Sequence, residues 1–103
     1  MNKMKEAVIV EVARTPVGKF RKSLAAFEAP VLGGMAMKKV VEKAGIKPET
    51  LDEVIYANLF NYNWGNLARL AVLEAGFPVS VPAISVNRQC ASSLDAVAFG
   101  ASL

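Results

Sequence analysis

One thiol is the residue of this sequence best suited to covalent chemistry. Cys90 is its only cysteine. It lies between Pro82–Asn87, which predicts a strand, and an apolar run from Cys90 to Leu103, which predicts a helix. The partial positive charge at a helix start favours a thiolate over a thiol, and unpaired N–H groups there can stabilise an oxyanion. The pattern therefore predicts a cysteine nucleophile and its anion-binding donors within one turn of chain.

A more ordinary interpretation of Cys90 stays open at this point. Free cysteine is among the most buried residue types, so Cys90 could equally be a small core residue. The sequence contains no histidine, so neither a cysteine–histidine pair nor a histidine-based metal site can form within it. Ser92 and Ser93 have an ordinary role in satisfying N–H groups at a helix start. No metal or resident cofactor is predicted.

The elements that would position Cys90 alternate between strand and helix. Apolar, β-branched runs predict three strands, over Glu6–Ala13, Glu53–Asn58 and Val81–Asn87. Helical spacing predicts three helices, from Pro30 to Gly45, from Asn66 to Gly76 and from Cys90 to Leu103. The βαβαβα order predicts an α/β fold with a parallel sheet and right-handed crossovers.

Several residues predict how these helices begin, end and pack. Pro30 suits a first turn, Gly45 suits a helix end, and Asn66 suits an N-cap. The pair Gly33–Gly34 inside the first helix predicts close packing against a neighbouring backbone. The last helix is apolar nearly all round except for Asp95, so we expect it to be buried on most sides.

Two arginines, Arg14 and Arg69, are interpreted as loop anchors that hydrogen-bond backbone carbonyl groups. Anion contacts are the alternative for both.

The composition narrows the possible partners. Hydrophobic residues make up 53% and charged residues 20%, which fits one small globular domain. The net charge of +3 is modest and no basic run alternates with aromatic residues, so no nucleic acid partner is expected. No apolar run is long enough to cross a bilayer, so no membrane partner is expected.

A single cysteine excludes an intrachain disulfide and fits a reducing compartment, so we expect a cytoplasmic location.

Three segments together resemble the thiolase family, which comprises acetyl-CoA acetyltransferases and 3-ketoacyl-CoA thiolases. Asn87–Val97 (NRQCASSLDAV) resembles the nucleophile segment of that family. Ala13–Phe20 (ARTPVGKF) resembles the exit of its first strand, and Gly65–Arg69 (GNLAR) resembles the start of its second helix. The segments occur in the family's order and at family-like spacing, so the resemblance covers essentially the whole chain.

The resemblance implies a fold and a chemistry. Thiolases are five-layered α-β-α-β-α sandwiches of two similar halves, so residues 1–103 would be part of the N-terminal domain. Cys90 would accept the acyl group during thiolytic cleavage of a 3-ketoacyl-CoA, or during the reverse Claisen condensation of acetyl-CoA, and its N–H would belong to an oxyanion hole. Acyl-CoA and coenzyme A would be substrates, with no further cofactor. A homodimer or homotetramer would be the assembly.

Length is the largest departure from the family. Thiolases are several times longer, and their acid–base histidine and second reactive cysteine lie in a C-terminal half that this sequence lacks. We therefore expect the chain to be the first part of a longer protein or to associate, and to be inactive alone.

Two other functions remain open. One is a ketoacyl-synthase-type condensing enzyme, which shares the fold and the cysteine corner, although the NRQC and ARTP runs favour a thiolase. The other is a catalytically silent βαβ interaction module, which the lack of histidine favours for this chain as written.

Overall fold

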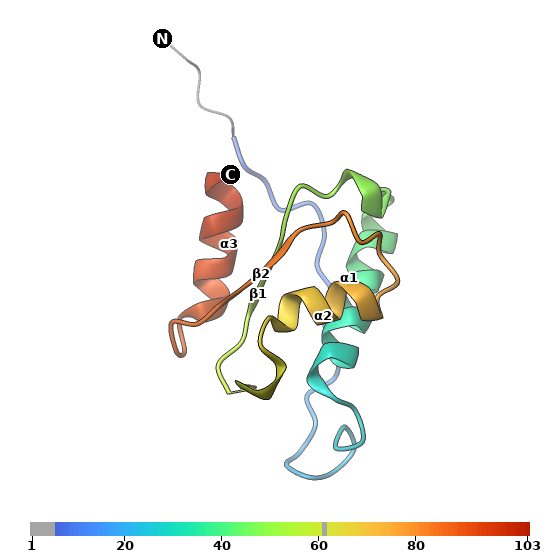
Figure 1. Cartoon of the computed structure of the whole chain (residues 1–103), viewed down its shortest axis with the longest axis vertical. Coiled ribbons are helices and arrows are strands. Elements are labelled where there is room, and N and C mark those ends of the chain that lie inside the picture. The colour runs from blue at the N-terminus through green and yellow to red at the C-terminus, as the bar shows by residue number, and fades with distance from the viewer. Residues whose placement is uncertain (1–5, 61) are drawn as a thin grey trace.

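The computed structural model describes residues 6–60 and 62–103 and shows an α/β arrangement (Figure 1). Its helices are α1 (Ala29–Ala44), α2 (Leu67–Glu74) and α3 (Ser92–Ser102). Its strands are β1 (Val54–Ala57) and β2 (Ala83–Val86). Two short 3₁₀ turns, η1 (Pro48–Thr50) and η2 (Tyr62–Trp64), lie on either side of β1 along the chain. The predicted second and third strands and all three predicted helices are therefore present.

The two strands form a parallel pair with helices on both sides. Val54 lies opposite Ala83 and Ala57 lies opposite Val86. Figure 1 shows α3 on one side of the strands and α1 and α2 on the other. The helix α2 packs against α1 and both strands, whereas α3 packs against the strands. The α/β class and the parallel pairing are thus confirmed.

The ends of α1 and α2 follow the signals predicted for them. Pro30 occupies the first turn of α1. Gly45 ends that helix in the left-handed region, with φ of 68°, and its N–H donates to the carbonyl oxygens of Val41 and Glu42. Asn66 caps α2, because its Oδ1 accepts the Arg69 N–H at 3.3 Å. The local signals in the sequence therefore predict these boundaries correctly.

The glycine pair in α1 allows the close packing that its sequence predicts. A Cβ on Gly34 would lie 3.1 Å from both the carbonyl oxygen of Ala71 in α2 and the nitrogen of Ala75, the residue that follows this helix. A Cβ on Gly33 would lie 2.7 Å from the ring atom Cε2 of Tyr56, whose hydroxyl donates a hydrogen bond to the Gly33 carbonyl oxygen. The two glycines therefore bring α1 against α2 and against β1.

The hydrophobic core lies where α1, α2 and β1 meet. Its members are small or β-branched for the most part, which suits the short distance between the helices. The buried cluster consists of Met37, Val41, Val54, Ala68, Ala71, Val72, Ala75, Phe77 and Val81.

The first predicted strand, Glu6–Ala13, is absent from the structure. The segment is not paired with either strand, and its apolar side chains from Ala7 to Val12 are exposed, with Ile9 at 77%. Lys43 of α1 holds its end, donating to the Val12 carbonyl oxygen at 2.7 Å and lying 3.3 Å from Glu11 Oε1. β-branched residues favour a strand only where a partner supplies hydrogen bonds and cover, and the described residues supply neither here.

The last helix is also less buried than its composition predicts. One side of α3 packs on the strands, but Leu94 is 74% exposed, and Val97 and Phe99 are at least half exposed. No described segment covers this outer side. The expectation of a helix buried on most sides is therefore wrong for this structure. Among the described residues, no helix is both long and apolar enough to cross a membrane.

Candidate active site

Cys90 lies in an exposed loop between β2 and α3. The helix begins at Ser92, two residues later than predicted, because the preceding residues form tight turns. The Ala91 N–H donates to the Arg88 carbonyl oxygen and the Ser92 N–H donates to the Gln89 carbonyl oxygen, each at 3.1 Å. Since the Cys90 side chain is exposed, the interpretation as a small core residue is wrong, and the thiol is accessible to a reactant.

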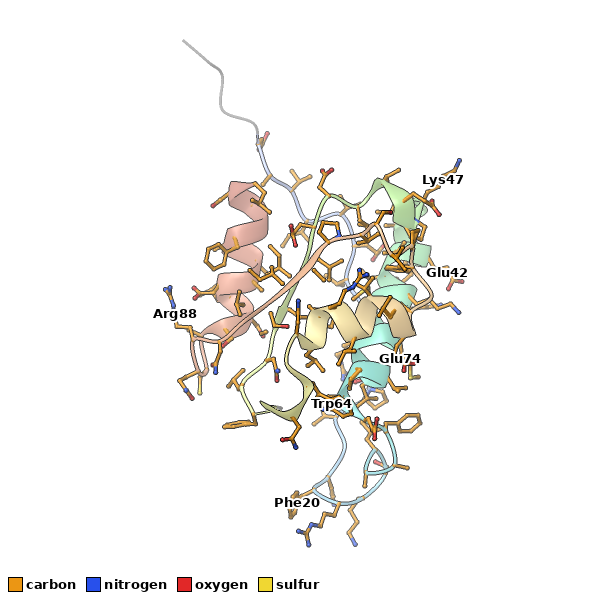
Figure 2. The ribbon with its side chains drawn as sticks, viewed as in Figure 1. Phe20, Glu42, Lys47, Trp64, Glu74 and Arg88 are labelled. Atoms are coloured by element: carbon orange, nitrogen blue, oxygen red, sulfur yellow. The ribbon has the colours of Figure 1, made fainter. Side chains whose placement is uncertain are left out.

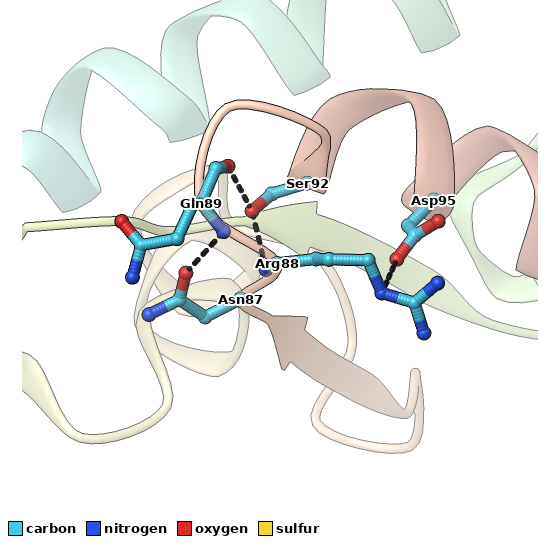
Figure 3. Close-up of polar contacts among 5 residues, drawn as sticks. All are labelled: Asn87, Arg88, Gln89, Ser92 and Asp95. Atoms are coloured by element: carbon cyan, nitrogen blue, oxygen red, sulfur yellow. Dashed lines mark hydrogen bonds and ion pairs between the residues drawn. The ribbon is translucent and has the colours of Figure 1, made fainter.

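The buried hydroxyl group of Ser92 forms two hydrogen bonds that hold this loop. Its side chain is completely buried, with 0% exposure. Its Oγ accepts the Arg88 N–H at 2.7 Å and donates to the Gln89 carbonyl oxygen at 2.6 Å (Figure 3). Gln89 itself has φ of 50°, in the left-handed region that favours glycine. Sequence reasoning missed this clamp, because a serine at a helix start ordinarily caps the helix.

Two further contacts fix the outside of the loop. Asn87 Oδ1 accepts the Gln89 N–H at 3.0 Å. Arg88 Nε lies 2.7 Å from Asp95 Oδ2 in the first turn of α3, where an acidic side chain also complements the helix dipole. Figure 2 places Arg88 beside α3, on the opposite side of the molecule from Glu42 and α1. Polar side chains therefore hold the loop both at Gln89 and at Arg88.

The N–H groups around Cys90 are already committed to hydrogen bonds. Those of Arg88, Gln89, Ala91 and Ser92 donate within the loop. Among the N–H groups of residues 88–92, all of which the structure describes, only that of Cys90 donates none of these hydrogen bonds. A thiolate attacking a carbonyl group produces an oxyanion close to its own residue, where that N–H can donate. The geometry therefore offers a nucleophile and one oxyanion donor at the same residue.

A second polar network fixes the strand that leads into the loop. Ser85 Oγ of β2 donates to Asn66 Oδ1 at 2.8 Å and accepts the Ala68 N–H at 2.9 Å. Asn66 Nδ2 donates to the Ala83 carbonyl oxygen at 2.9 Å. The cap of α2 is therefore bonded directly to β2. The sequence predicts the Asn66 cap, whereas the part played by Ser85 depends on contacts between distant segments.

The two arginines contact backbone carbonyl groups. Arg69 Nη1 donates to the carbonyl oxygens of Val79 and Val81, at 3.0 and 3.1 Å, and so anchors the segment before β2. Arg14 Nη1 donates to the Thr15 carbonyl oxygen at 3.3 Å. The loop-anchor interpretation is confirmed for Arg69, and the Arg14 contact is confined to its neighbour. Within the described ranges, no three cysteine or acidic side chains gather as a metal site would require.

The chain therefore packs helices on both sides of a parallel strand pair (Figure 1) and carries its cysteine in the loop that leads into the last helix. The family model described as thiolase, N-terminal domain, matches residues 7–103. The chain belongs to this family.

Individual relatives carry the comparison further. The chain is 46% identical over 99 residues to an acetyl-CoA acetyltransferase of Cupriavidus necator, covering 95% of this chain and 25% of that protein. The crystal structure of the Bacillus anthracis acetyl-CoA acetyltransferase superposes with a TM-score of 0.91 at 32% identity, covering 98% of this chain and 26% of that one. A thiolase of Ascaris suum in complex with coenzyme A gives 0.87 at 27% identity, covering 95% and 26%. The chain thus spans about a quarter of the length of these relatives.

Proposed function

We propose that this chain contributes the nucleophile of a thiolase-type acetyl-CoA C-acyltransferase, with Cys90 as the residue that carries the acyl group. The observation that carries the proposal is the exposed thiol of Cys90, held in a loop where the N–H groups of Arg88, Gln89, Ala91 and Ser92 are hydrogen-bonded. Membership of the thiolase family and the likeness to acetyl-CoA acetyltransferases support the same chemistry.

The first half of the proposed reaction breaks a carbon–carbon bond. The Cys90 thiolate attacks the C3 carbonyl carbon of a 3-ketoacyl-CoA, forming an S–C bond and placing negative charge on the carbonyl oxygen. The Cys90 N–H stabilises this oxyanion. When the carbonyl group re-forms, the C2–C3 bond breaks and its electron pair stays on C2. Protonation at C2 gives acetyl-CoA and leaves an acyl-Cys90 thioester.

The second half transfers the acyl group to coenzyme A. The coenzyme A thiolate attacks the acyl-Cys90 carbonyl carbon, a new S–C bond forms, and the Cys90 thiolate leaves. One thioester replaces another, so the step is nearly isoenergetic, which suits cysteine better than serine. The reverse sequence condenses two acetyl-CoA molecules. The sequence contains no histidine and no second cysteine. Protonation at C2 and deprotonation of the coenzyme A thiol therefore require groups from outside this chain.

The proposal also covers partners, assembly and location. Coenzyme A thioesters are the proposed substrates, supported by the coenzyme A complex of the Ascaris suum thiolase. The proposed assembly is a homodimer or homotetramer, for which the exposed apolar side of α3 offers a contact surface. A cytoplasmic location is proposed because an exposed, unpaired thiol persists in a reducing compartment.

Neither alternative has comparable support. A ketoacyl-synthase-type condensing enzyme would share the cysteine corner, but the family model and the relatives described above favour a thiolase. A catalytically silent interaction module has one supporting observation, the absence of histidine. Both alternatives predict a different outcome in the experiment below.

The test is thiolysis of acetoacetyl-CoA by the protein purified from its source, with its intact mass measured first. Cys90→Ala should lower kcat/KM by about 10³-fold or more, because the nucleophile is lost. Ser93→Ala, which changes an exposed side chain on the first turn of α3, is the matched control and should leave the rate near the unmodified value. Thiolysis that survives Cys90→Ala would refute the proposal.

The 103-residue chain alone should show no thiolysis, because it lacks a histidine to act as general base. The same assay on the purified chain measures this. Turnover by the chain that disappears in Cys90→Ala would show that its own residues supply the missing proton transfers.

A further inference from the structure

We propose that Ser92 is a positioning residue for Cys90, whose buried hydroxyl holds the Cys90 N–H where it can donate to the oxyanion. The inference rests on the proposed function, because it takes Cys90 as the nucleophile. Its basis is the set of contacts that the Ser92 side chain makes within the described loop (Figure 3).

The hydroxyl of Ser92 closes the chain around Cys90. It bonds the N–H of Arg88 and the carbonyl group of Gln89, both before the cysteine, whereas Ser92 itself follows the cysteine. The Ser92 N–H adds a second bond to the same Gln89 carbonyl oxygen, at 3.1 Å. Cys90 is therefore the central residue of a short ring closed by hydrogen bonds, so the direction of its N–H depends on that ring.

These contacts differ from those of an ordinary helix cap. A capping serine accepts an N–H from the first turn of its own helix, ahead of it in the chain. Ser92 is the first residue of α3, the N-cap position is Ala91, and no side-chain cap bond is made there. The Ser92 hydroxyl reaches backward, into the loop that carries the thiol. Its contacts therefore serve the geometry of the loop more directly than they serve the start of the helix.

The backbone at Gln89 requires such support. A non-glycine residue with φ of 50° persists only where its surroundings hold it in that region. The carbonyl group of Gln89 is held by both bonds from Ser92, and its N–H is held by Asn87 Oδ1. Loss of the hydroxyl would remove one of the three bonds that hold this residue and leave the partly buried Arg88 N–H without a partner. The residue that follows Gln89 is Cys90, so the thiol and its N–H would lose their fixed direction.

Two reactions of the Cys90 thiol distinguish an effect on the position of its N–H from an effect on the reactivity of the thiol itself. Transfer of an acetyl group from acetyl-CoA to Cys90 passes through an oxyanion, whereas alkylation by iodoacetamide does not. Both are measured by intact mass on the protein purified from its source, with denatured protein as the reference. Ser92→Ala should lower the rate of acetyl transfer by about tenfold or more and leave the alkylation rate little changed.

A pair of variants of similar size controls for volume at this fully buried position. Ser92→Thr keeps the hydroxyl and should acetylate close to the unmodified rate, whereas Ser92→Val lacks it and should behave as Ser92→Ala does. Equal acetyl transfer in Ser92→Thr and Ser92→Val, or a parallel loss of both reactions in Ser92→Ala, would overturn the positioning role. Unmodified protein that acetylates no faster than denatured protein would instead refute the proposed function itself.

Amide hydrogen exchange on the unmodified chain tests the ring without any substitution. The Arg88 N–H should exchange more slowly than the Cys90 N–H in the same loop, because the former donates to a buried hydroxyl. Equal exchange at the two amides would overturn the proposed clamp even if the serine variants failed to fold.

Discussion

Tyr56 is a single residue that links the sheet to a helix and whose ionisation is coupled to folding. Its hydroxyl donates to the Gly33 carbonyl oxygen of α1, and burial raises the pKa of Tyr56 from 10.0 to about 12. Between these two values the unfolded chain loses the phenolic proton while the folded chain retains it. The contribution of this residue to stability is therefore complete below pH 10 and falls as the pH rises toward about 12.

We expect Tyr56→Phe to lower the free energy of unfolding by about 1 kcal/mol at neutral pH, because one hydrogen bond is lost. The variant should also lose the part of the alkaline destabilisation that Tyr56 causes. Denaturant unfolding measured from pH 7 to pH 11 tests both effects. Identical alkaline slopes for the two proteins would contradict the assigned role.

The residues around Cys90 show what sequence can predict at this scale. The position of Cys90 between a strand and a helix was predictable because a lone cysteine between a strand pattern and a helix pattern is a local feature. The clamp formed by Ser92 was not, because a serine beside a helix start has the same sequence signal whether it bonds forward to the helix or backward to the loop. Only the fold of residues 87–92 distinguishes the two.

Two glycines in helices should respond to alanine in opposite ways. Gly34→Ala would place a methyl group 3.1 Å from backbone atoms of α2, and overpacking of this kind costs about 1–3 kcal/mol. That cost exceeds the gain in helix propensity, about 1 kcal/mol, so we expect net destabilisation. Gly100→Ala in α3 meets only the Ile55 side chain, at 4.0 Å, so this matched control should be stabilised by about 0.5–1 kcal/mol.

Thermal or denaturant unfolding tests this prediction, because the free energy of unfolding should fall in Gly34→Ala and rise in Gly100→Ala. A stabilised Gly34→Ala would show that α1 and α2 can separate without loss of packing.

Elements with local signals were predicted well, and elements that depend on distant partners were not. Pro30, Gly45 and Asn66 set the ends of α1 and α2 through their own backbone and side-chain chemistry. The strand predicted over Glu6–Ala13 depended on a partner strand, which no described segment provides. The start of α3 shifted to Ser92 because the turns around Cys90 use the preceding residues.

At the scale of the whole molecule, the most evident feature is apolar surface without cover. Leu94 and Val97 on α3 and Ile9 in the unpaired first segment are all more than half exposed. Apolar patches of this kind drive association in water. We therefore expect the purified chain to self-associate as its concentration rises.

Sedimentation velocity over a range of concentrations measures this association. The double variant Leu94→Glu with Val97→Glu should remain monomeric at concentrations where the unmodified chain associates. Val79→Glu introduces a charge at another exposed apolar residue, away from α3, and should have little effect. A monomeric unmodified chain at every concentration would contradict the expectation.

The parallel pairing of β1 and β2 also has a consequence for the order in which the chain folds. Val54 and Ala83 are 29 positions apart, so the whole of α2 must be placed before their strands can pair. The contact of α1 with α2, between Gly34 and Ala71, closes a longer length of chain, 37 positions. We expect strand pairing to come first, docking of α1 on α2 next, and the loop around Cys90 last, because that loop begins where β2 ends. The Cys90 thiol would then acquire its geometry only after the rest of the chain had folded.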